Sequence, residues 1–219
     1  MLRQLVNQCR LTVRLSTADP ILIKAGAANT RDVEMAAVRT IRDGREEVYL
    51  PGSSLKGAIR SHCERIARTL NDAAACDPLA RSGPYRSCND VLDEREHPRP
   101  GGQRPPGQGA AGPTATYRDS CPVCRIFGTS HISSRALFGD GLLAPDSTPV
   151  VAIRDGIGID RFTGGAATRV RYEAEVVTDA TFLVDVALRN FELAQLGLVW
   201  LALRDLMRGE LRLGSGKSR

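Results

Sequence analysis

Aromatic side chains are scarce in this sequence, because Phe, Trp and Tyr make up only 5% of the 219 residues. Proteins that read single-stranded nucleic acids base by base usually stack the bases on aromatic rings, so broad base recognition is not expected. The formal net charge is +5, which favours a polyanionic partner. If that partner is a nucleic acid, contacts with its phosphate backbone should dominate binding.

Long hydrophobic runs are also absent. No stretch of about 18 apolar residues could span a bilayer. The first residues, "MLRQLVNQCRLTVRLST", lack the apolar core of a signal peptide. We therefore expect a cytoplasmic protein with no membrane partner, in which the six cysteines are free thiols or metal ligands rather than disulfides.

A complete P-loop is missing too. The sequence "GSGKS" near residue 216 resembles half of one, but Leu211 stands where the pattern needs glycine and no helix is expected to follow, so we do not expect an NTPase. Four residues of this segment could still hold a phosphate through backbone amides and cations, with a disordered basic tail as the alternative. They are Gly214, Gly216, Lys217 and Arg219.

Hydrophobic periodicity predicts an α+β protein. Strands are expected at 9–16, 134–144, 171–177 and 181–189, helices at 53–70 and 191–208, and a projecting hairpin or loop at 152–170. The order strand, helix, strand, strand, helix is typical of a ferredoxin-like core, which needs one more strand. We expect this closing strand to be missing from the chain or supplied by another one.

The middle of the chain has no clear periodicity. We expect residues 71–130 to form an insertion within a single domain that spans 1–219. Within it, the segment 94–116 is too rich in proline and glycine to pack, so it should be flexible.

Cysteine spacing in the insertion predicts a metal site. Cys121 and Cys124 form a "CPVC" motif, whose two-residue spacing can place both sulfurs on one tetrahedral ion. Cys76 and Cys88 could complete a structural zinc site, because the entropic cost of closing a long loop grows slowly with its length. The alternative is a set of unrelated reduced cysteines. The histidines are possible substitutes for a cysteine ligand: His62, His97 and His131.

The decapeptide "PGSSLKGAIR", residues 51–60, predicts the start of a helix. Ser53 or Ser54 can cap its first amide groups. An apolar stripe follows at helical spacing. Its members are Leu55, Ile59, Cys63, Ile66 and Leu70.

The same stretch also suits a phosphate group. The unpaired amides at a helix start attract anions, and Lys56 and Arg60 lie within reach of them. Gly52 and Gly57 would let a nucleic-acid backbone approach closely. The alternative is an ordinary capped helix with solvated cations.

Two acids stand close together in "TRDVEMAAVRT". Asp32 and Glu34 could hold a divalent cation or help a 2′-hydroxyl group attack the adjacent phosphate. Solvated carboxylates without a catalytic role are the alternative.

Four motifs in a fixed order are shared with one known family: "PGSSLKGAIRS", "CPVCRIFG", "GIDRFTGGA" followed by "YEAEVV", and "GSGKSR". The chain resembles the backbone-forming RAMP subunits of type III CRISPR effector complexes. The segment "VEMAAVRT…YLPGSSLKG" is most similar to the type III-D branch. The resemblance covers nearly the whole length except the insertion rich in proline and glycine.

This resemblance implies a ferredoxin-like, RNA-recognition fold whose copies or relatives stack along a guide RNA. The expected partners are the guide RNA, a target RNA, and sibling effector subunits or further RAMP subunits. Residues near the guide backbone would be Ser53, Ser54, Lys56 and Arg60, together with the glycine-rich "GSGKSR" segment. The thumb hairpin that wedges into the guide–target duplex would carry Arg161, Phe162, Thr163, Gly164 and Gly165.

The resemblance also bears on metals and catalysis. The family's zinc site commonly includes the "CPVC" pair. In active relatives, an aspartate before the first helix supports target-RNA cleavage with Mg²⁺ or Mn²⁺. Here Glu34 occupies that position and Asp32 lies two residues earlier. Three readings remain: a guide-binding subunit that also cleaves target RNA, a standalone metal-independent endoribonuclease that processes repeat RNA, and an inert structural subunit.

Overall fold

The computed structural model describes residues 4–26, 33–83, 85–96 and 113–214. The chain divides into two compact units. The first unit comprises Met1–Leu11, Lys56–Leu137 and Val186–Arg212, and the second comprises Thr12–Leu55, Phe138–Asp185 and Leu213–Arg219. Three long elements contribute residues to both units: β1 (Gln8–Ser16), α1 (Gly52–Leu70) and β8 (Thr181–Arg189).

The largest sheet has the strand order β1-β8-β4, and the short strand β5 (Leu142–Leu143) also pairs with β8. Pairs such as Thr12 with Asp185 and Ser16 with Thr181 show that β1 and β8 run antiparallel. Buried side chains alternate along β8 as the period of two requires, so the strands predicted at 9–16 and 181–189 are confirmed. The α+β class is therefore confirmed as well.

The single strand predicted at 134–144 is wrong. The structure has two short strands there, β4 (Ala136–Phe138) and β5, separated by "GDG". Gly141 lies between them and exchanges backbone hydrogen bonds with Leu50. A Cβ atom at Gly141 would lie 2.9 Å from Val184 and 3.0 Å from Leu50, so this close approach depends on glycine.

Helix α1 begins one residue before the predicted serine cap. Its first amide, at Gly52, donates to the Asp140 carboxylate at 2.7 Å. Ser53 and Ser54 therefore lie inside the first turn with exposed side chains, and the prediction that one of them caps the helix is wrong. The cap comes instead from a residue far away in sequence, which local pattern could not reveal.

The apolar stripe of α1 is mostly confirmed. Leu55, Ile59 and Cys63 are fully buried. The last predicted member, Leu70, is 81% exposed, and the buried stripe ends at Ala67.

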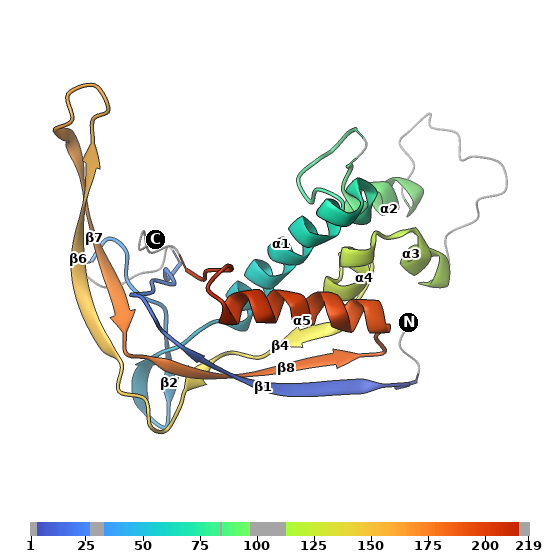
Figure 1. Cartoon of the computed structure of the whole chain (residues 1–219), viewed down its shortest axis with the longest axis horizontal. Helices are drawn as coiled ribbons and strands as arrows, with labels where there is room; N and C mark the ends of the chain where they lie inside the picture. Colours follow the sequence, from blue (N-terminus) through green and yellow to red (C-terminus); the bar gives the residue numbers. More distant parts are fainter. Residues whose placement is uncertain (1–3, 27–32, 84, 97–112, 215–219) are drawn as a thin grey trace. The chain divides into compact units, whose positions relative to one another are not determined.

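Two antiparallel hairpins supply further strands of the second unit. One joins β2 (Arg39–Arg42) to β3 (Arg45–Val48) through Asp43 and Gly44, both with positive φ. Its Asp-Gly turn is a standard hairpin signal that our sequence analysis missed. The other joins β6 (Val150–Ile159) to β7 (Ala166–Thr178), so that the hairpin expected at 152–170 lies within a longer two-stranded ribbon that includes the strand predicted at 171–177 (Figure 1).

The remaining helices belong to the first unit. They are the 3₁₀ helix η1 (Asp72–Ala74), α2 (Cys88–Glu96), α3 (Pro113–Asp119), α4 (Pro122–Phe127) and α5 (Leu193–Met207). The helix predicted at 191–208 is confirmed as α5, which begins with a reciprocal capping box between Glu192 and Gln195.

The prediction that 94–116 is flexible is wrong at both ends of this segment. Residues 94–96 complete α2, and α3 begins with Pro113, a residue type favoured at the first helical position. The stretch 97–112 lies outside the described residues.

Candidate metal centre and nucleic-acid interface

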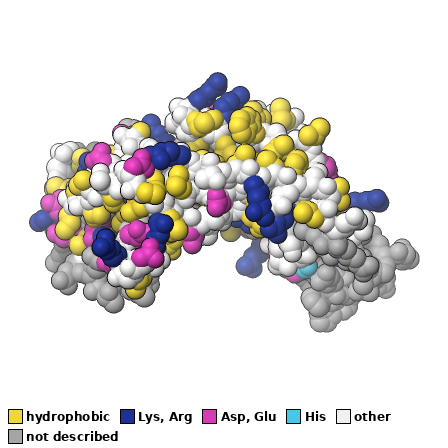
Figure 2. Space-filling view, turned by 90° about the horizontal axis from the view of Figure 1, so that it is seen from below, with side chains coloured by type: hydrophobic (Ala, Val, Ile, Leu, Met, Phe, Trp, Pro, Cys, Tyr) yellow, Lys and Arg dark blue, Asp and Glu magenta, His cyan; other side chains and the backbone are white. Residues whose placement is uncertain are grey.

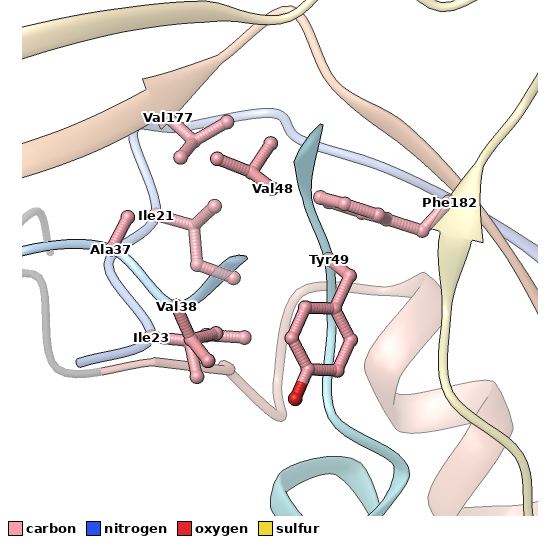
Figure 3. Close-up of a pocket in the computed structure, with 8 residues that line it drawn as sticks. All are labelled: Ile21, Ile23, Ala37, Val38, Val48, Tyr49, Val177 and Phe182. Atoms are coloured by element: carbon pink, nitrogen blue, oxygen red, sulfur yellow. The ribbon is translucent and has the colours of Figure 1, made fainter. Parts of the chain in front are cut away.

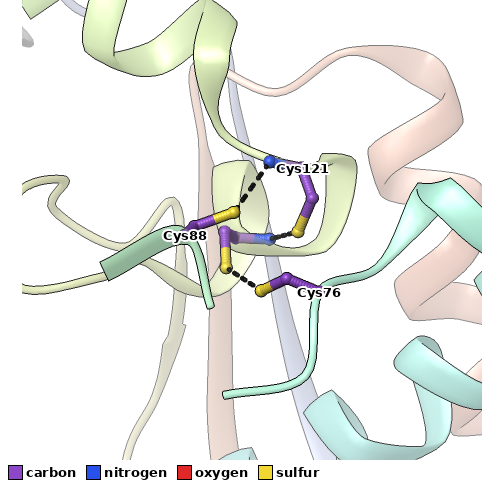
Figure 4. Close-up of side chains that lie close together, drawn as sticks. Cys76, Cys88 and Cys121 are labelled. Carbon is purple, nitrogen blue, oxygen red and sulfur yellow. Dashed lines mark hydrogen bonds between the residues drawn. The ribbon is translucent and has the colours of Figure 1, made fainter. Parts of the chain in front are cut away.

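Four cysteines from three separate segments meet in the first unit. The Sγ atoms of Cys76, Cys88, Cys121 and Cys124 all lie within 4.8 Å of one another. Three of these side chains are buried and Cys121 is half-buried. Figure 4 shows the labelled cysteines pointing toward a common centre from three different chain segments. The predicted clustering is therefore confirmed, although Cys88 and Cys121 are 33 residues apart.

Local backbone structure explains how the "CPVC" pair converges. Cys121 is the N-cap of α4, and its sulfur accepts a hydrogen bond from the backbone amide of Cys124 at 3.4 Å. Pro122 occupies the first turn, where its missing N–H costs nothing. The Cys121 amide donates in turn to the sulfur of Cys88 at 3.3 Å. Backbone amides thus point at two sulfurs, which suits thiolates better than thiols.

The electrostatics of the cluster favour a cation. Hydrogen bonds from the Cys124, Cys76 and Cys88 side chains lower the pKa of Cys121, whereas the neighbouring Cys121 raises the pKa of Cys124. Cys121 raises the pKa of Cys76, but hydrogen bonds with Cys124 and Cys88 lower it overall. Thiolates therefore form more readily at Cys121 and Cys76, and crowding opposes further negative charge. A divalent ion would relieve this repulsion, and four sulfurs around one point match a closed tetrahedral site without an open coordination position.

Arg60 lies beside this cluster. Its guanidinium donates to Glu64 at 3.0 Å, to the Gly128 carbonyl at 3.2 Å and to the Cys124 sulfur at 3.4 Å. Burial opposes its charge, but the hydrogen bond to Glu64 and the nearby Cys124 sulfur raise the pKa of Arg60 overall. The resemblance implies that Arg60 lies at the guide backbone, whereas in the structure its hydrogen bonds go to Glu64, Gly128 and one cysteine of the cluster.

The start of α1 borders a pocket of about 220 Å³ in the second unit. Ser54 and Gly214 both line it, so two residues predicted from distant motifs come together. Gly214 has φ 84°, and a Cβ atom there would lie 2.7 Å from the Leu22 carbonyl oxygen, so the position needs glycine. Lys24 adds a cation that our sequence analysis missed, because nothing in its loop marks it. The predicted residues Gly216, Lys217 and Arg219 lie outside the described residues.

Lys56 follows the serines on α1. Partial burial lowers its pKa, and the nearby charge of Arg60 lowers it further. A cation that is partly removed from water and faces a like charge gains from an anionic partner. Ser53 is exposed one turn earlier, so the helix start offers hydroxyl groups and a cation to a ligand.

The predicted thumb residues occupy the turn between β6 and β7. Phe162 is 100% exposed, and Arg161, Gly164 and Gly165 are also exposed. Asp160, which our sequence analysis missed, organises the turn by accepting hydrogen bonds from the Phe162 amide and the Thr163 hydroxyl. These two bonds lower the pKa of Asp160. The turn therefore presents an aromatic ring fully to solvent.

The candidate catalytic acids are only partly described. Asp32 lies outside the described residues. Glu34 is exposed, and its neighbour Met35 is anchored to β7 by backbone hydrogen bonds to Glu173 and Glu175. Among the described residues, the metal-ligating side chains that lie close together are the four cysteines, and Glu34 is not part of that group.

A second pocket in this unit is small and lined mostly by apolar side chains. Its volume is about 10 Å³. Figure 3 shows it surrounded by aliphatic side chains, Phe182 and the ring of Tyr49. Such a space fits a packing gap in the core, not a ligand site.

The two described histidines are both engaged. His62 Nε2 lies 2.7 Å from the Asp205 carboxylate and its Nδ1 lies 2.8 Å from Arg65. His131 Nε2 lies 2.8 Å from Asp93. Neither lies among the cysteines, so the possible substitution of a cysteine ligand by either histidine is wrong. His97 lies outside the described residues.

A model of the RAMP superfamily matches residues 14–219. The match covers most of the chain, so the protein belongs to the RAMP superfamily. This membership indicates a CRISPR-associated RNA-binding subunit that works with CRISPR RNA in an effector complex. No curated protein matches the sequence. In the part of the chain that the structure describes, no helix is long and apolar enough to cross a membrane.

Proposed function

We propose that this chain is a guide-RNA-binding backbone subunit of a type III CRISPR effector complex, of the kind found in the type III-D branch. The observation that carries the proposal is the family match over residues 14–219. The sheet order β1-β8-β4, with α1 following β1 and α5 following β8 along the chain, supports a ferredoxin-like core.

The guide backbone would lie at the start of α1. Ser53, Ser54 and Lys56 offer hydroxyl groups and a cation, and Lys24 adds a second cation at the pocket that Ser54 and Gly214 line. On the face drawn in Figure 2, Lys and Arg side chains are interspersed with apolar and acidic ones. Binding would therefore depend on local phosphate contacts, which accept any guide sequence because base pairing reads the target.

The β6–β7 hairpin would act as the thumb. Its exposed Phe162 can stack on a base at a displaced pair, while Gly164 and Gly165 leave room for the nucleic-acid backbone. Stacking on one ring needs few aromatic residues, in agreement with the composition of the chain.

The cysteine cluster would hold a structural zinc ion. Four sulfur ligands close the coordination sphere, so the ion would stabilise the fold of the first unit and would not take part in cleavage. Arg60 is left out of the proposed RNA contacts, because its donors already bind Glu64, Gly128 and Cys124.

Asp32 and Glu34 are the candidates for metal-dependent cleavage of the paired target RNA with Mg²⁺ or Mn²⁺. The test is target cleavage by the complex reconstituted with its sibling subunits and a guide, comparing wild type with Asp32→Ala and Glu34→Ala. Asp19→Ala, which removes an exposed carboxylate elsewhere in the second unit, is the matched control. We expect one of the two substitutions to remove a single cut, mapped at nucleotide resolution, while guide binding persists.

An unchanged cleavage pattern in both variants would assign cutting to the neighbouring subunits and leave this chain as a scaffold. The backbone role would be refuted if the complex retains its guide RNA without this chain and the chain itself binds no guide. Cleavage of repeat RNA by the isolated chain in EDTA would instead support a metal-independent processing enzyme. Such an enzyme needs a general base, and the ring nitrogens of the two described histidines already bind Asp205, Arg65 and Asp93.

A further inference from the structure

Helix α1 carries three charged residues spaced one turn apart on the side that faces the cysteine cluster. Arg60 donates to Glu64 at 3.0 Å, and Arg68 lies 4.0 Å from the other oxygen of the same carboxylate. Glu64 is buried, at 8% exposure, so its charge needs the two arginines. We call these three residues the charged ladder.

Each end of the charged ladder holds a different part of the cysteine cluster. Arg60 binds the sulfur of Cys124 and the carbonyl oxygen of Gly128, which follows the helix that carries Cys124. Arg68 binds the carbonyl oxygens of Ala75 at 3.3 Å and Cys76 at 2.6 Å. One helix therefore joins two cysteine-bearing segments that are 48 residues apart.

We propose that the charged ladder is the outer shell of the metal centre, in which Arg60 and Arg68 are positioning residues for Cys124 and Cys76. This inference rests on the proposed metal centre. Four thiolates around a divalent cation leave two uncompensated negative charges, and the centre lies in a largely buried place. A guanidinium that donates to one sulfur offsets part of that charge, and outer-shell groups of this kind orient ligands and tune the ion.

The two arginines have different chemical effects, which makes the proposal testable. Arg60 contacts a sulfur atom, so it acts on both the geometry and the electron density of a ligand. Arg68 contacts only backbone oxygens at this site, so it acts on geometry alone. Loss of the Arg60 hydrogen bond should raise the energy of the sulfur lone pairs and shift a sulfur-to-metal charge-transfer band to longer wavelength.

The experiment uses the full chain and its Arg60→Met, Arg60→Lys and Arg68→Met variants, with Arg65→Met as the control. Arg65 lies on the same helix but contacts His62 instead of the cluster. Zn²⁺ affinity is measured by chelator competition, and the absorption spectrum is recorded with Co²⁺ as the probe. Far-ultraviolet circular dichroism checks that each variant is folded.

We expect Zn²⁺ affinity to fall about 10- to 100-fold in Arg60→Met and Arg68→Met. The Co²⁺ charge-transfer band should move only in Arg60→Met, and Arg60→Lys should restore part of the affinity by retaining a positive donor. Wild-type Zn²⁺ affinity in both Arg60→Met and Arg68→Met, or an equal loss of affinity in Arg65→Met, would overturn the outer-shell role and leave the metal centre intact. Failure of the wild-type chain to bind Zn²⁺ or Co²⁺ would overturn the metal centre itself.

Discussion

At the scale of single residues, the structure joins α1 and α5 through a buried polar contact. His62 and Asp205 are 8% and 6% exposed, and their side chains meet at 2.7 Å. A guanidinium can only donate, so the bond from Arg65 makes Nδ1 of His62 an acceptor and assigns the hydrogen to Nε2, which donates to Asp205. Arg204 donates to the second oxygen of Asp205. Buried carboxylates need such complete pairing.

This arrangement predicts acid sensitivity of the first unit. The hydrogen bond from His62, followed by that from Arg204, lowers the pKa of Asp205. A carboxylate whose pKa is lower in the folded protein than its unfolded value of about 3.9 contributes stability above that pH, and loses it as the pH falls through the folded-state pKa. Asp205→Asn should therefore lower the urea midpoint at neutral pH.

The difference between wild type and Asp205→Asn should shrink below about pH 4, where the wild type loses this contribution. Asp185→Asn, which changes an exposed carboxylate, serves as the control. A gap between the two urea curves that stays constant from neutral to acid pH would show that the Asp205 charge does not stabilise the fold.

At the scale of elements, α1 contains two glycines with opposite surroundings. A Cβ atom at Gly52 would lie 2.4 Å from the Phe138 carbonyl oxygen and 2.6 Å from that of Gly139. At Gly57 it would meet nothing within 4 Å. Gly52 thus serves the packing of the helix start, whereas packing gives no reason for the glycine at position 57.

We therefore expect Gly52→Ala and Gly57→Ala to change stability in opposite directions. Overpacking against backbone should destabilise Gly52→Ala by about 1–3 kcal/mol. The higher helix propensity of alanine should stabilise Gly57→Ala by about 0.5–1 kcal/mol. Thermal unfolding of the two variants measures both effects. A Gly57→Ala variant that is more stable yet binds guide RNA less tightly would support close approach of the RNA at this position, and a destabilised one would contradict the open surroundings.

At the scale of the whole molecule, the few aromatic side chains and the net charge of +5 favour RNA binding through the phosphates. The family match indicates an RNA-binding subunit, and the contacts proposed at the start of α1 would be made to phosphates. Such binding depends on salt concentration more than on base sequence.

We expect the logarithm of guide-RNA affinity to fall linearly with the logarithm of salt concentration, with a slope of roughly −0.7 for each phosphate contacted in single-stranded RNA. Lys56→Met should reduce the magnitude of the slope by about one unit or less and weaken unrelated guide sequences equally. Arg81→Met, which removes an exposed arginine from a loop of the first unit, is the control. Filter binding over a salt series measures the slopes. Equal slopes for wild type and Lys56→Met would exclude Lys56 as a phosphate contact, and strong dependence on guide sequence would contradict binding dominated by the phosphates.

Features that depend on neighbours along the chain could be predicted without the structure. Period-two alternation located β1 and β8, helical periodicity located α1 and α5, and the "CPVC" spacing pointed to the cysteine cluster. Backbone geometry sets these periods and spacings, so they are visible in a short window of residues.

Contacts between distant segments needed the tertiary structure. Asp140, not a local serine, caps α1. Arg60 turns toward Cys124 instead of the helix start, and Lys24 joins Ser54 and Gly214 at one pocket. A charged or polar side chain can reach many partners, and the partner that it takes is whichever group the folded chain brings near and leaves unpaired when water is excluded.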